Sequence, residues 1–530
     1  MNTLYYGDNL NVLREHVPDE SVDLIYLDPP FNSKRDYNIL YREPMGGSSS
    51  AQITAFEDTW HWTDEAERAY QEITDTAPPA LVEMMQSFRR FIGVNDMMAY
   101  LTMMAIRLIE LRRVLKPTGS IYLHCDPTAS HYLKILLDAV FGKANFRNEI
   151  SWRRSHPKGH AFTRFANNHD VIFSYAKDSH KVLWNQSYKV HDPEKIKSQY
   201  TLKDESGRLY QLTSLLNPNP NRPNLTYKFK GVTRVWRWTK ERMQAEDDKG
   251  NIVVPRGGSG IPRYKRYLDE QEGVPIGDFW EDVELVSGGE KLGFPTQKPV
   301  ALLERIIQAS SNAGDVVLDP FCGCGTTIVA AQKLKRKWVG IDITHLAISL
   351  IENRLREHFP RAKFEVLGTP KDLEGARDLA DRDKHQFEWW ALSLVGARPY
   401  GDKKKGGDTG IDGIMYFRVS PTETVKVVVS VKGGGNINPG MVRDLKGVME
   451  REKAGMGVFI TLEPPTAGMK KEAAAAGVYK HPLNDLTYPK LQMFTIEELL
   501  DGTKLKAPAQ AETFKKASII DTIKQQGFDL

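Results

Sequence analysis

The chain has 530 residues, of which 41% are hydrophobic and 26% charged, and it carries a formal net charge of +4. This composition is typical of folded domains and excludes disordered and fibrous proteins, and the length suggests about three or four structural units. The three cysteines lack zinc-binding spacing, no apolar run is long enough for a membrane span, and the first residues lack a secretory pattern. We therefore expect a cytoplasmic protein without a membrane anchor.

Strands and helices alternate in two separate stretches of the chain. Residues 22–27 read as a buried strand, and helical patterns at 81–92 and 96–115 precede a second strand at 120–124. The alternation returns at 299–358 as helix, strand, helix, strand and helix. Strands separated by helices predict an α/β fold with a parallel, doubly wound sheet of the Rossmann type.

Residues 151–290 interrupt this alternation with stretches rich in Pro, Gly and Asn, which predicts an inserted domain. Within 151–270, 23 Lys and Arg stand against 12 Asp and Glu, among 15 aromatic residues. Such a mixture suits a surface that neutralises phosphates and stacks bases, although a solvated basic face is the alternative. The expected division of the chain is a first catalytic part at 1–150, the insert at 151–290, a second catalytic part at 291–368, a linker at 369–385, a C-terminal domain at 386–505 and a tail at 506–530.

A glycine-rich turn follows the predicted strand 315–319 and opens a helix, in the run Asp319-Pro320-Phe321-Cys322-Gly323-Cys324-Gly325-Thr326. Glycines let a ligand approach the backbone closely, and a helix start offers free N–H groups. The run is neither G-x-G-x-x-G nor a Walker loop, which weakens dinucleotide and ATP interpretations and leaves a structural turn as the alternative. Asp342 ends the next strand, where a carboxylate can bond ribose hydroxyls.

The tetrapeptide Asp28-Pro29-Pro30-Phe31 ends the strand at 22–27, on the sheet edge where open α/β folds bind ligands. The Asp28 carboxylate and the Pro29 carbonyl could accept both hydrogens of an exocyclic amine, and Phe31 could stack on the base that carries it. Two prolines would hold these acceptors in place before the reaction. The alternative is a turn that only terminates the strand.

Together with Phe294-Pro295-Thr296-Gln297-Lys298-Pro299, these motifs resemble S-adenosylmethionine-dependent DNA amino-methyltransferases over about residues 1–368. The catalytic tetrapeptide precedes the cofactor loop, an order similar to the β class, in which the insert is the target-recognition domain. The resemblance implies methyl transfer by Asp28, Pro29, Pro30 and Phe31 to a flipped-out base, with adenine N6 favoured over cytosine N4. It also implies a set of cofactor-binding residues, with Asp8 as the adenine-side acid: Asp8, Thr296, Gln297, Lys298, Pro299, Asp319, Pro320, Phe321, Gly323, Gly325, Thr326 and Asp342.

The C-terminal domain carries a second set of candidate residues. Glu388 lies in a helical pattern, Asp412 precedes a predicted strand, and Ser430 and Lys432 lie on the next strand. An acid beside one strand and a lysine on the next can bind Mg²⁺ and activate water. The pattern resembles Mrr-like PD-(D/E)XK nucleases, which implies a restriction-endonuclease-like α/β domain with these four catalytic residues and Asp412 as a Mg²⁺ ligand. Ser430 departs from the Glu or Gln usual there, so both a cutting and a non-cutting domain stay open.

The leading hypothesis is therefore an adenine-specific DNA methyltransferase fused to a Mg²⁺-dependent endonuclease, acting in restriction–modification or phage defence. The alternatives are a solitary adenine or cytosine methyltransferase whose C-terminal domain only binds DNA, a non-catalytic DNA-binding regulator, and an RNA substrate. The expected partner is double-stranded DNA, with a homodimer and further restriction subunits as open possibilities. The recognition sequence does not follow from residues 151–290, because base contacts depend on the folded surface.

Overall fold

The structure is a computed structural model that describes residues 2–30, 36–42, 48–57, 61–156, 163, 165–255, 260–287, 290, 292, 297–400, 410–420, 423–482, 486–508 and 510–511. Two compact units make up the chain, one comprising Met1–Asn185 and Asp278–Leu530 and the other comprising Gln186–Gly277. Within these described ranges, no helix is both long and apolar enough to cross a membrane.

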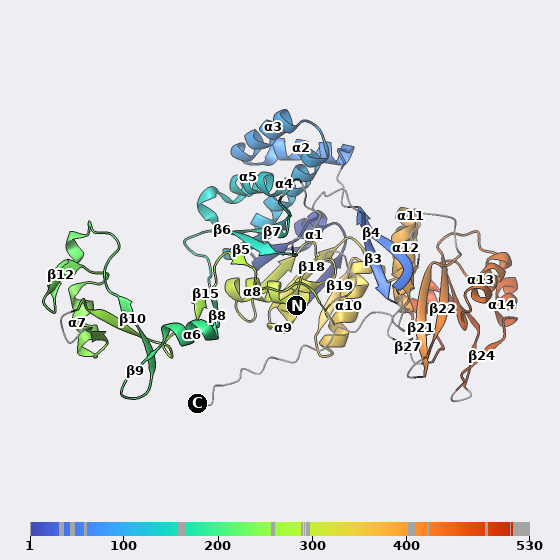
Figure 1. Ribbon diagram of the computed structural model, residues 1–530. Helices are drawn as coiled ribbons and strands as arrows, with labels where there is room; N and C mark the ends of the chain where they lie inside the picture. Colours follow the sequence, from blue (N-terminus) through green and yellow to red (C-terminus); the bar gives the residue numbers. More distant parts are fainter. Residues whose placement is uncertain are drawn as a thin grey trace. The chain divides into compact units, whose positions relative to one another are not determined.

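A nine-stranded sheet forms the centre of the first unit, in the order β16-β6-β7-β5-β2-β17-β18-β1-β19 (Figure 1). Neighbouring strands pair in parallel except at β7, which runs antiparallel to both β5 and β6. The sheet is therefore mixed, whereas the alternation of elements predicted a parallel one. The strands are β1 (Asn2–Tyr6), β2 (Val22–Leu27), β5 (Leu115–Cys125), β6 (Phe146–Arg153), β7 (His169–Ala176), β16 (Phe279–Trp280), β17 (Val316–Asp319), β18 (Lys337–Asp342) and β19 (Phe364–Leu367).

Helices cover both faces of this sheet, as in a doubly wound fold. One face packs with α1 to α5 into a single apolar core, and α8, α9 and α10 lie against the other face (Figure 1). These helices are α1 (Asn9–His16), α2 (Asp64–Thr76), α3 (Pro79–Ile92), α4 (Asp96–Val114), α5 (Ser130–Phe141), α8 (Val300–Ser310), α9 (Thr326–Lys333) and α10 (His345–His358). The strands and helices predicted at 22–27, 81–92, 96–115, 120–124 and 299–358 are confirmed, with boundaries shifted by a few residues.

The second unit is narrower than the insert predicted at 151–290, because β6, β7 and β16 pair into the main sheet. It contains a four-stranded sheet in the order β13-β14-β10-β9 and a separate hairpin of β11 and β12. Trp236, one of the aromatic residues considered for base stacking, is fully buried in this unit's core. The elements are β8 (Tyr188–Lys189), α6 (Pro193–Gln199), β9 (Leu202–Lys203), β10 (Leu209–Ser214), β11 (Thr226–Phe229), β12 (Val232–Val235), α7 (Lys240–Asp248), β13 (Ile252–Val253), β14 (Arg263–Tyr267) and β15 (Val274–Pro275).

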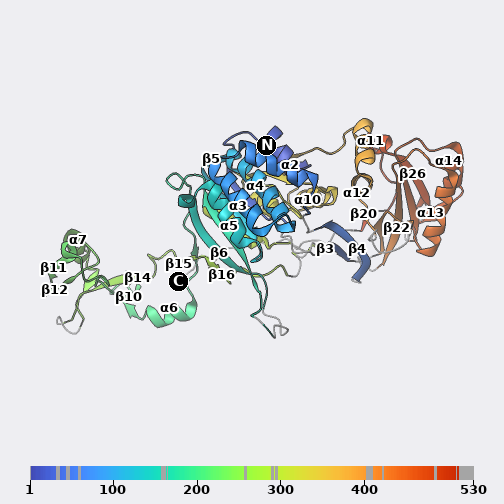
Figure 2. The ribbon, with the colours of Figure 1, turned by 90° about the horizontal axis from the view of Figure 1, so that it is seen from above.

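The C-terminal domain is a sheet in the order β20-β21-β22-β23-β26, with β27 paired to β21. Helices α11 (Leu373–Arg382), α12 and α15 pack on one face and α13 and α14 on the other, so the predicted α/β layering is present. Figure 2 shows α11 and α12 on one side of this sheet and α13 and α14 on the other. Its elements are α12 (Lys384–Leu394), β20 (Arg398–Pro399), β21 (Gly413–Ser420), β22 (Glu423–Lys432), α13 (Pro439–Arg451), β23 (Met456–Thr461), α14 (Ala467–Ala474), β24 (Val478–Lys480), β25 (Thr487–Pro489), β26 (Leu491–Thr495), α15 (Ile496–Leu500) and β27 (Gln510–Ala511). Elsewhere, β3 (Asp36–Arg42) and β4 (Ser48–Glu57) pair antiparallel, and short 3₁₀ turns span Lys143–Asn145 and Pro223–Leu225.

The linker interpretation of residues 369–385 needs a correction, because helix α11 (Leu373–Arg382) occupies most of this segment. Ala376, Leu379 and Ala380 are buried in the core of the C-terminal domain. Their spacing of three and four residues places them on one helical face, although the surrounding charges made the segment look solvated. Small apolar side chains within a charged stretch therefore concealed a packed helix.

Candidate functional site

Three carboxylates meet at one edge of the main sheet. Asp28 follows β2, while Asp319 and Asp342 end β17 and β18, and these strands are adjacent and parallel. Burial raises the pKa of Asp319 to about 7 and that of Asp342 to about 6, because a desolvated carboxylate resists ionisation. A cation bound among these groups would offset that cost, so the edge favours a positively charged ligand.

The glycine-rich turn closes tightly over this edge. Gly323 and Gly325 have φ values of +48° and +75°, a conformation that glycine adopts without steric cost. A Cβ atom on Gly325 would lie 2.6 Å from Cγ1 of Ile351, so a larger residue would collide with α10. The Gly323 N–H donates to Oδ2 of Asp342 at 2.9 Å. The turn and the predicted ribose acid are thus directly joined.

Three further hydrogen bonds hold the glycine-rich turn in place. The Phe321 N–H donates to Oδ1 of Asp319 at 3.0 Å, and the buried Arg354 guanidinium donates to the carbonyl of Cys324. Pro320 accepts a hydrogen bond from the Asn9 amide at 2.8 Å. The turn leads directly into α9, whose first residue is Thr326, as the sequence predicted. Arg354 and Asn9 were not among the predicted residues.

The two carboxylate oxygens of Asp28 lie in different surroundings. Oδ2 pairs with the ammonium group of Lys298, which is only 8% exposed. Oδ1 is buried and has no hydrogen-bond partner among the residues that the structure describes. A buried acceptor without a donor costs about 1–3 kcal/mol, so this oxygen is poised to receive an N–H from a ligand. The predicted role of Lys298 in cofactor binding stays a prediction; in the structure its ammonium group contacts Asp28.

Asp8 occupies a structural position at the end of β1. Its Oδ1 accepts the Leu10 N–H at 2.8 Å and caps α1, while Oδ2 pairs with Arg107 of α4 at 2.8 Å. Both oxygens therefore already have partners inside the protein. Its role as the adenine-side acid stays a prediction.

The segment before α8 is held by contacts within itself. The Gln297 side chain donates to the carbonyl of Glu290 at 2.6 Å and accepts from the Leu292 N–H at 2.8 Å. Pro299 directly precedes α8. Roles for Gln297 and Pro299 in cofactor binding stay predictions. Two further candidates, Phe31 and Thr296, lie outside the described residues.

A buried polar chain that sequence reasoning missed runs behind Asp28. The Tyr26 hydroxyl lies 2.8 Å from Nδ1 of His124, whose Nε2 lies 3.2 Å from Asp170, and Asp170 pairs with Arg154 at 2.9 Å. Each ring nitrogen of His124 therefore has one polar partner within hydrogen-bonding distance. Burial raises the pKa of Asp170, but His124 and nearby cations outweigh it and lower the pKa overall. These side chains link strands β2, β5 and β7.

The C-terminal candidates converge in part. Oδ2 of Asp412 accepts from the Val431 N–H at 2.7 Å, from the Ser430 hydroxyl at 3.1 Å and from the Lys432 ammonium at 3.5 Å. Glu388 lies on α12, where it pairs with His385 at 3.8 Å. Asp412, Ser430 and Lys432 therefore meet as predicted, while a shared site with Glu388 stays a prediction.

This arrangement does not fit a Mg²⁺ ion. Mg²⁺ prefers carboxylate oxygens and water, yet one Asp412 oxygen already accepts three protein donors, including a cation, and Ser430 contributes a neutral hydroxyl. In the part of the chain that the structure describes, no three His, Cys, Asp or Glu side chains cluster as metal ligands. The predicted Mg²⁺ site at Asp412 therefore gains no support from the geometry.

Two protein families match the chain in separate regions. The family described as DNA methylase, of the N6/N4 methyltransferases, matches residues 22–353. The family described as NACHT-associated inactive Restriction Endonuclease 1 matches residues 384–501. The first match contains seven of the nine sheet strands, the three carboxylates and the glycine-rich turn, and the second covers most of the C-terminal domain.

Individual relatives also match large parts of the chain. The Type II methyltransferase M.EcaI of Enterobacter cloacae is 31% identical over 394 residues, which cover 73% of this chain and 76% of the relative. The Mod subunit of the Type III restriction-modification enzyme StyLTI of Salmonella typhimurium is 26% identical, and the match spans 63% of this chain but only 50% of that protein. A putative DNA modification methylase of Thermus thermophilus, solved with S-adenosyl-L-methionine, is 17% identical and matches 69% of this chain and 100% of its own, with a TM-score of 0.33. Because the methylase family matches more than half of its length and M.EcaI is 31% identical over most of both proteins, the chain belongs to the N6/N4 DNA methylase family.

Proposed function

We propose that the protein transfers a methyl group from S-adenosylmethionine to N6 of an adenine flipped out of duplex DNA. The observation that carries this proposal is the buried, unpaired Oδ1 of Asp28, held beside Lys298 at the ligand-binding edge of the sheet. The family includes both adenine and cytosine enzymes, and the Asp-first tetrapeptide favours adenine. Both bases carry the exocyclic amine that this acceptor would receive.

The residues at the sheet edge fit the proposed cofactor. S-adenosylmethionine supplies, when bound, a methyl group activated by its positively charged sulfur. The Asp319 and Asp342 carboxylates would hold this cationic molecule, and their raised pKa values are those of acids that lack a counter-charge. Gly323 and Gly325 would let it approach the backbone at the start of α9.

The tetrapeptide would orient the amine for attack. Asp28 Oδ1 accepts one amine hydrogen and the Pro29 carbonyl accepts the other, which favours a tetrahedral nitrogen with an available lone pair. Lys298 keeps Asp28 in position by binding its other oxygen. Such alignment and pre-organised electrostatics supply most of the barrier reduction when the transferred group is already activated. Flipping the base out of the duplex costs a few kcal/mol.

We place this activity in restriction and modification, because similar proteins are Type II methyltransferases and the Mod subunit of a Type III enzyme. A separate restriction subunit would then cut DNA that lacks the mark. This setting requires no nuclease activity within the chain itself.

The test is methylation of duplex DNA followed by mass spectrometry of the nucleosides, which separates N6-methyladenine from N4-methylcytosine. Asp28→Ala should reduce transfer by at least about a thousandfold while leaving the cofactor affinity, measured by calorimetry, nearly unchanged. Asp501→Ala, an exposed acid after α15, is the matched control. Full activity of Asp28→Ala would refute the mechanism, and methylcytosine as the product would refute the proposed target.

For the C-terminal domain, we propose DNA holding without cleavage. The observations that favour it are the saturated Asp412 oxygen and the match to a family described as inactive restriction endonucleases. Plasmid incubated with Mg²⁺ should stay intact with the wild type and with Lys432→Ala, while duplex affinity falls in the variant because a cation is lost. Cleavage by the wild type that disappears in Lys432→Ala would overturn this proposal and restore the nuclease hypothesis.

A further inference from the structure

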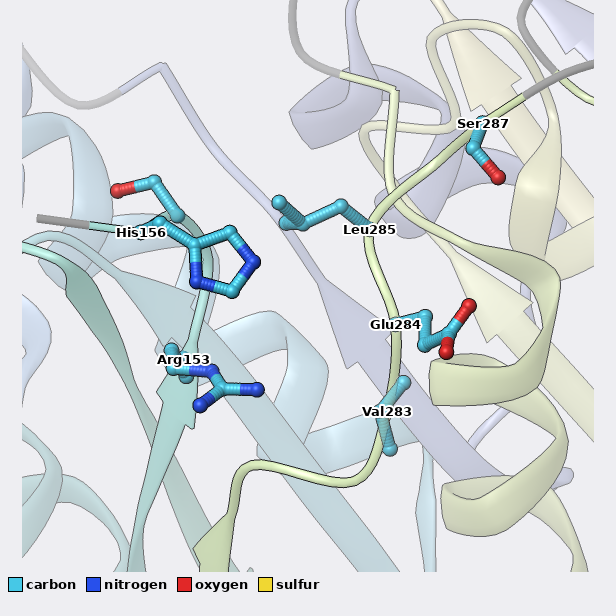
Figure 3. Close-up of a pocket in the computed structure, with 7 residues that line it drawn as sticks. Arg153, His156, Val283, Glu284, Leu285 and Ser287 are labelled. Carbon is cyan, nitrogen blue, oxygen red and sulfur yellow. The ribbon is translucent and has the colours of Figure 1, made fainter.

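A cleft of about 390 Å³ opens in the first unit at the end of β6. One wall is the end of β6 and the residues after it, and the other is the segment that follows β16. We call it the β6–β16 cleft, lined by Arg153, Ser155, His156, Val283, Glu284, Leu285 and Ser287 (Figure 3). Its volume is sufficient for part of a nucleotide.

The cleft lies on the same sheet edge as Asp28. β6 is parallel to β5 and β2 through the intervening β7, so the carboxyl ends of β6 and β2 face the same side. Three strand spacings separate β6 from β2, which amounts to about 14 Å, or roughly four base-pair steps of DNA. A duplex whose base enters the Asp28 site would therefore bring neighbouring base pairs within reach of the cleft.

The walls are fixed before any ligand arrives. Ser151 donates its N–H to the carbonyl of Asp278 at 2.9 Å, and the Trp152 indole donates to the carbonyl of Val283 at 3.2 Å. Arg153 donates to the carbonyl of Glu281 at 2.9 Å, which holds its guanidinium in place while part of the side chain stays exposed. A held donor loses less conformational entropy on binding than a free one.

The lining combines side-chain donors with an apolar floor. Arg153 and His156 project from one wall and Leu285 projects toward them from the other (Figure 3). Buried Val283 forms part of the floor, while the exposed Glu284 carboxylate points away from Arg153 and His156 (Figure 3). Arginine pairs with O6 and N7 of guanine.

We infer that the β6–β16 cleft reads one guanine–cytosine pair of the recognition sequence, through Arg153 to the guanine. This inference rests on the proposed methylation of duplex DNA. Sequence specificity would then reside partly in the main sheet, and not in residues 186–277 alone. A contact to phosphates by the same cations is the competing role, and it carries no sequence information.

The experiment maps the methylated motif in a bacterial host that lacks other DNA methyltransferases, using the full chain and single-molecule sequencing. Arg153→Ala should keep the target base but lose discrimination at one flanking guanine–cytosine position by about tenfold or more. Arg153→Lys keeps the charge but loses bidentate geometry, so it should lose discrimination too. Glu357→Gln on α10 and Arg361→Ala, both exposed and remote in the fold, are matched controls that should leave the motif unchanged.

Two results would overturn the inference. An unchanged motif with uniformly weaker methylation in Arg153→Ala would identify a phosphate contact instead. Discrimination equal to that of the controls in both Arg153 variants, each with a wild-type melting temperature, would show that the cleft reads no base. Absence of any methyl mark from the wild type would overturn the proposed function itself, and the inference with it.

Discussion

Replacing Lys298 by methionine would test whether the ion pair with Asp28 serves the reaction or only the fold. The pair is nearly enclosed, with side-chain exposures of 9% for Lys298 and 17% for Asp28. Removing one partner of a buried pair costs about 3–5 kcal/mol, because the remaining charge stays desolvated. Partial exposure of Asp28 places the expected loss at the lower end, about 3 kcal/mol. If the displaced Asp28 carboxylate stabilises the transition state by about 3 kcal/mol less, kcat falls about a hundredfold.

The assay is steady-state methylation of duplex DNA at saturating cofactor, with kcat and the cofactor KM measured separately. Lys298→Arg keeps the charge and should recover part of kcat. Lys333→Met is the matched control, because its pair with Glu304 is more exposed and such pairs contribute only about 0–1 kcal/mol. A kcat within about threefold of wild type in Lys298→Met would refute the positioning role. A defect confined to the cofactor KM would support the cofactor contact expected from the sequence.

Three further substitutions test the site. Asp319→Asn should stabilise the protein at pH 8 by up to about 4 kcal/mol and leave its stability unchanged near pH 4. Because the pKa of Asp319 is raised to about 7, the folded state binds more protons than the unfolded state between these pH values. The stability of the wild type therefore falls as the pH rises from about 4 to 7. A difference between the two proteins that does not grow with pH in urea denaturation would refute this. Gly325→Ala should destabilise the fold and weaken cofactor binding more than the control Gly314→Ala. Both positions have positive φ, but only an alanine at position 325 would bring its Cβ against Ile351. Equal melting temperatures and equal cofactor affinities of the two variants would contradict this expectation. Tyr26→Phe should cost about 1–3 kcal/mol of unfolding free energy, because a buried ring nitrogen of His124 loses its hydrogen-bond partner. A loss under about 0.5 kcal/mol would contradict a stabilising role for this hydrogen bond.

The motifs that could be predicted from the sequence are those whose local structure is set by residues adjacent in the chain. Asp28 follows a run of apolar residues, and Gly323 and Gly325 open a helix, so each motif carries its own strand or helix with it. The alternation of elements also placed Asp28 and Asp342 at the carboxyl ends of their strands, where open α/β sheets bind ligands. The confirmed strands and helices were long and strongly periodic, which is where such prediction succeeds.

Contacts between distant segments could not be predicted in this way. Lys298 reaches Asp28 across 270 residues, and His124 reaches Asp170 across 46, on strands whose pairing no local pattern announced. The reversal of β7 likewise depends on a return of the chain that looked like part of the insert.

The hydrogen-bond partners of Asp412 could not be predicted from the adjacent sequence either. The sequence placed an acid, a hydroxyl and a lysine close enough to resemble a metal site, but the fold turns one carboxylate oxygen toward three donors at once. The sequence by itself determined which residues end each strand, because local periodicity sets strand ends. Only the tertiary structure decided which partner each buried group has, because desolvation and hydrogen bonding depend on what surrounds it.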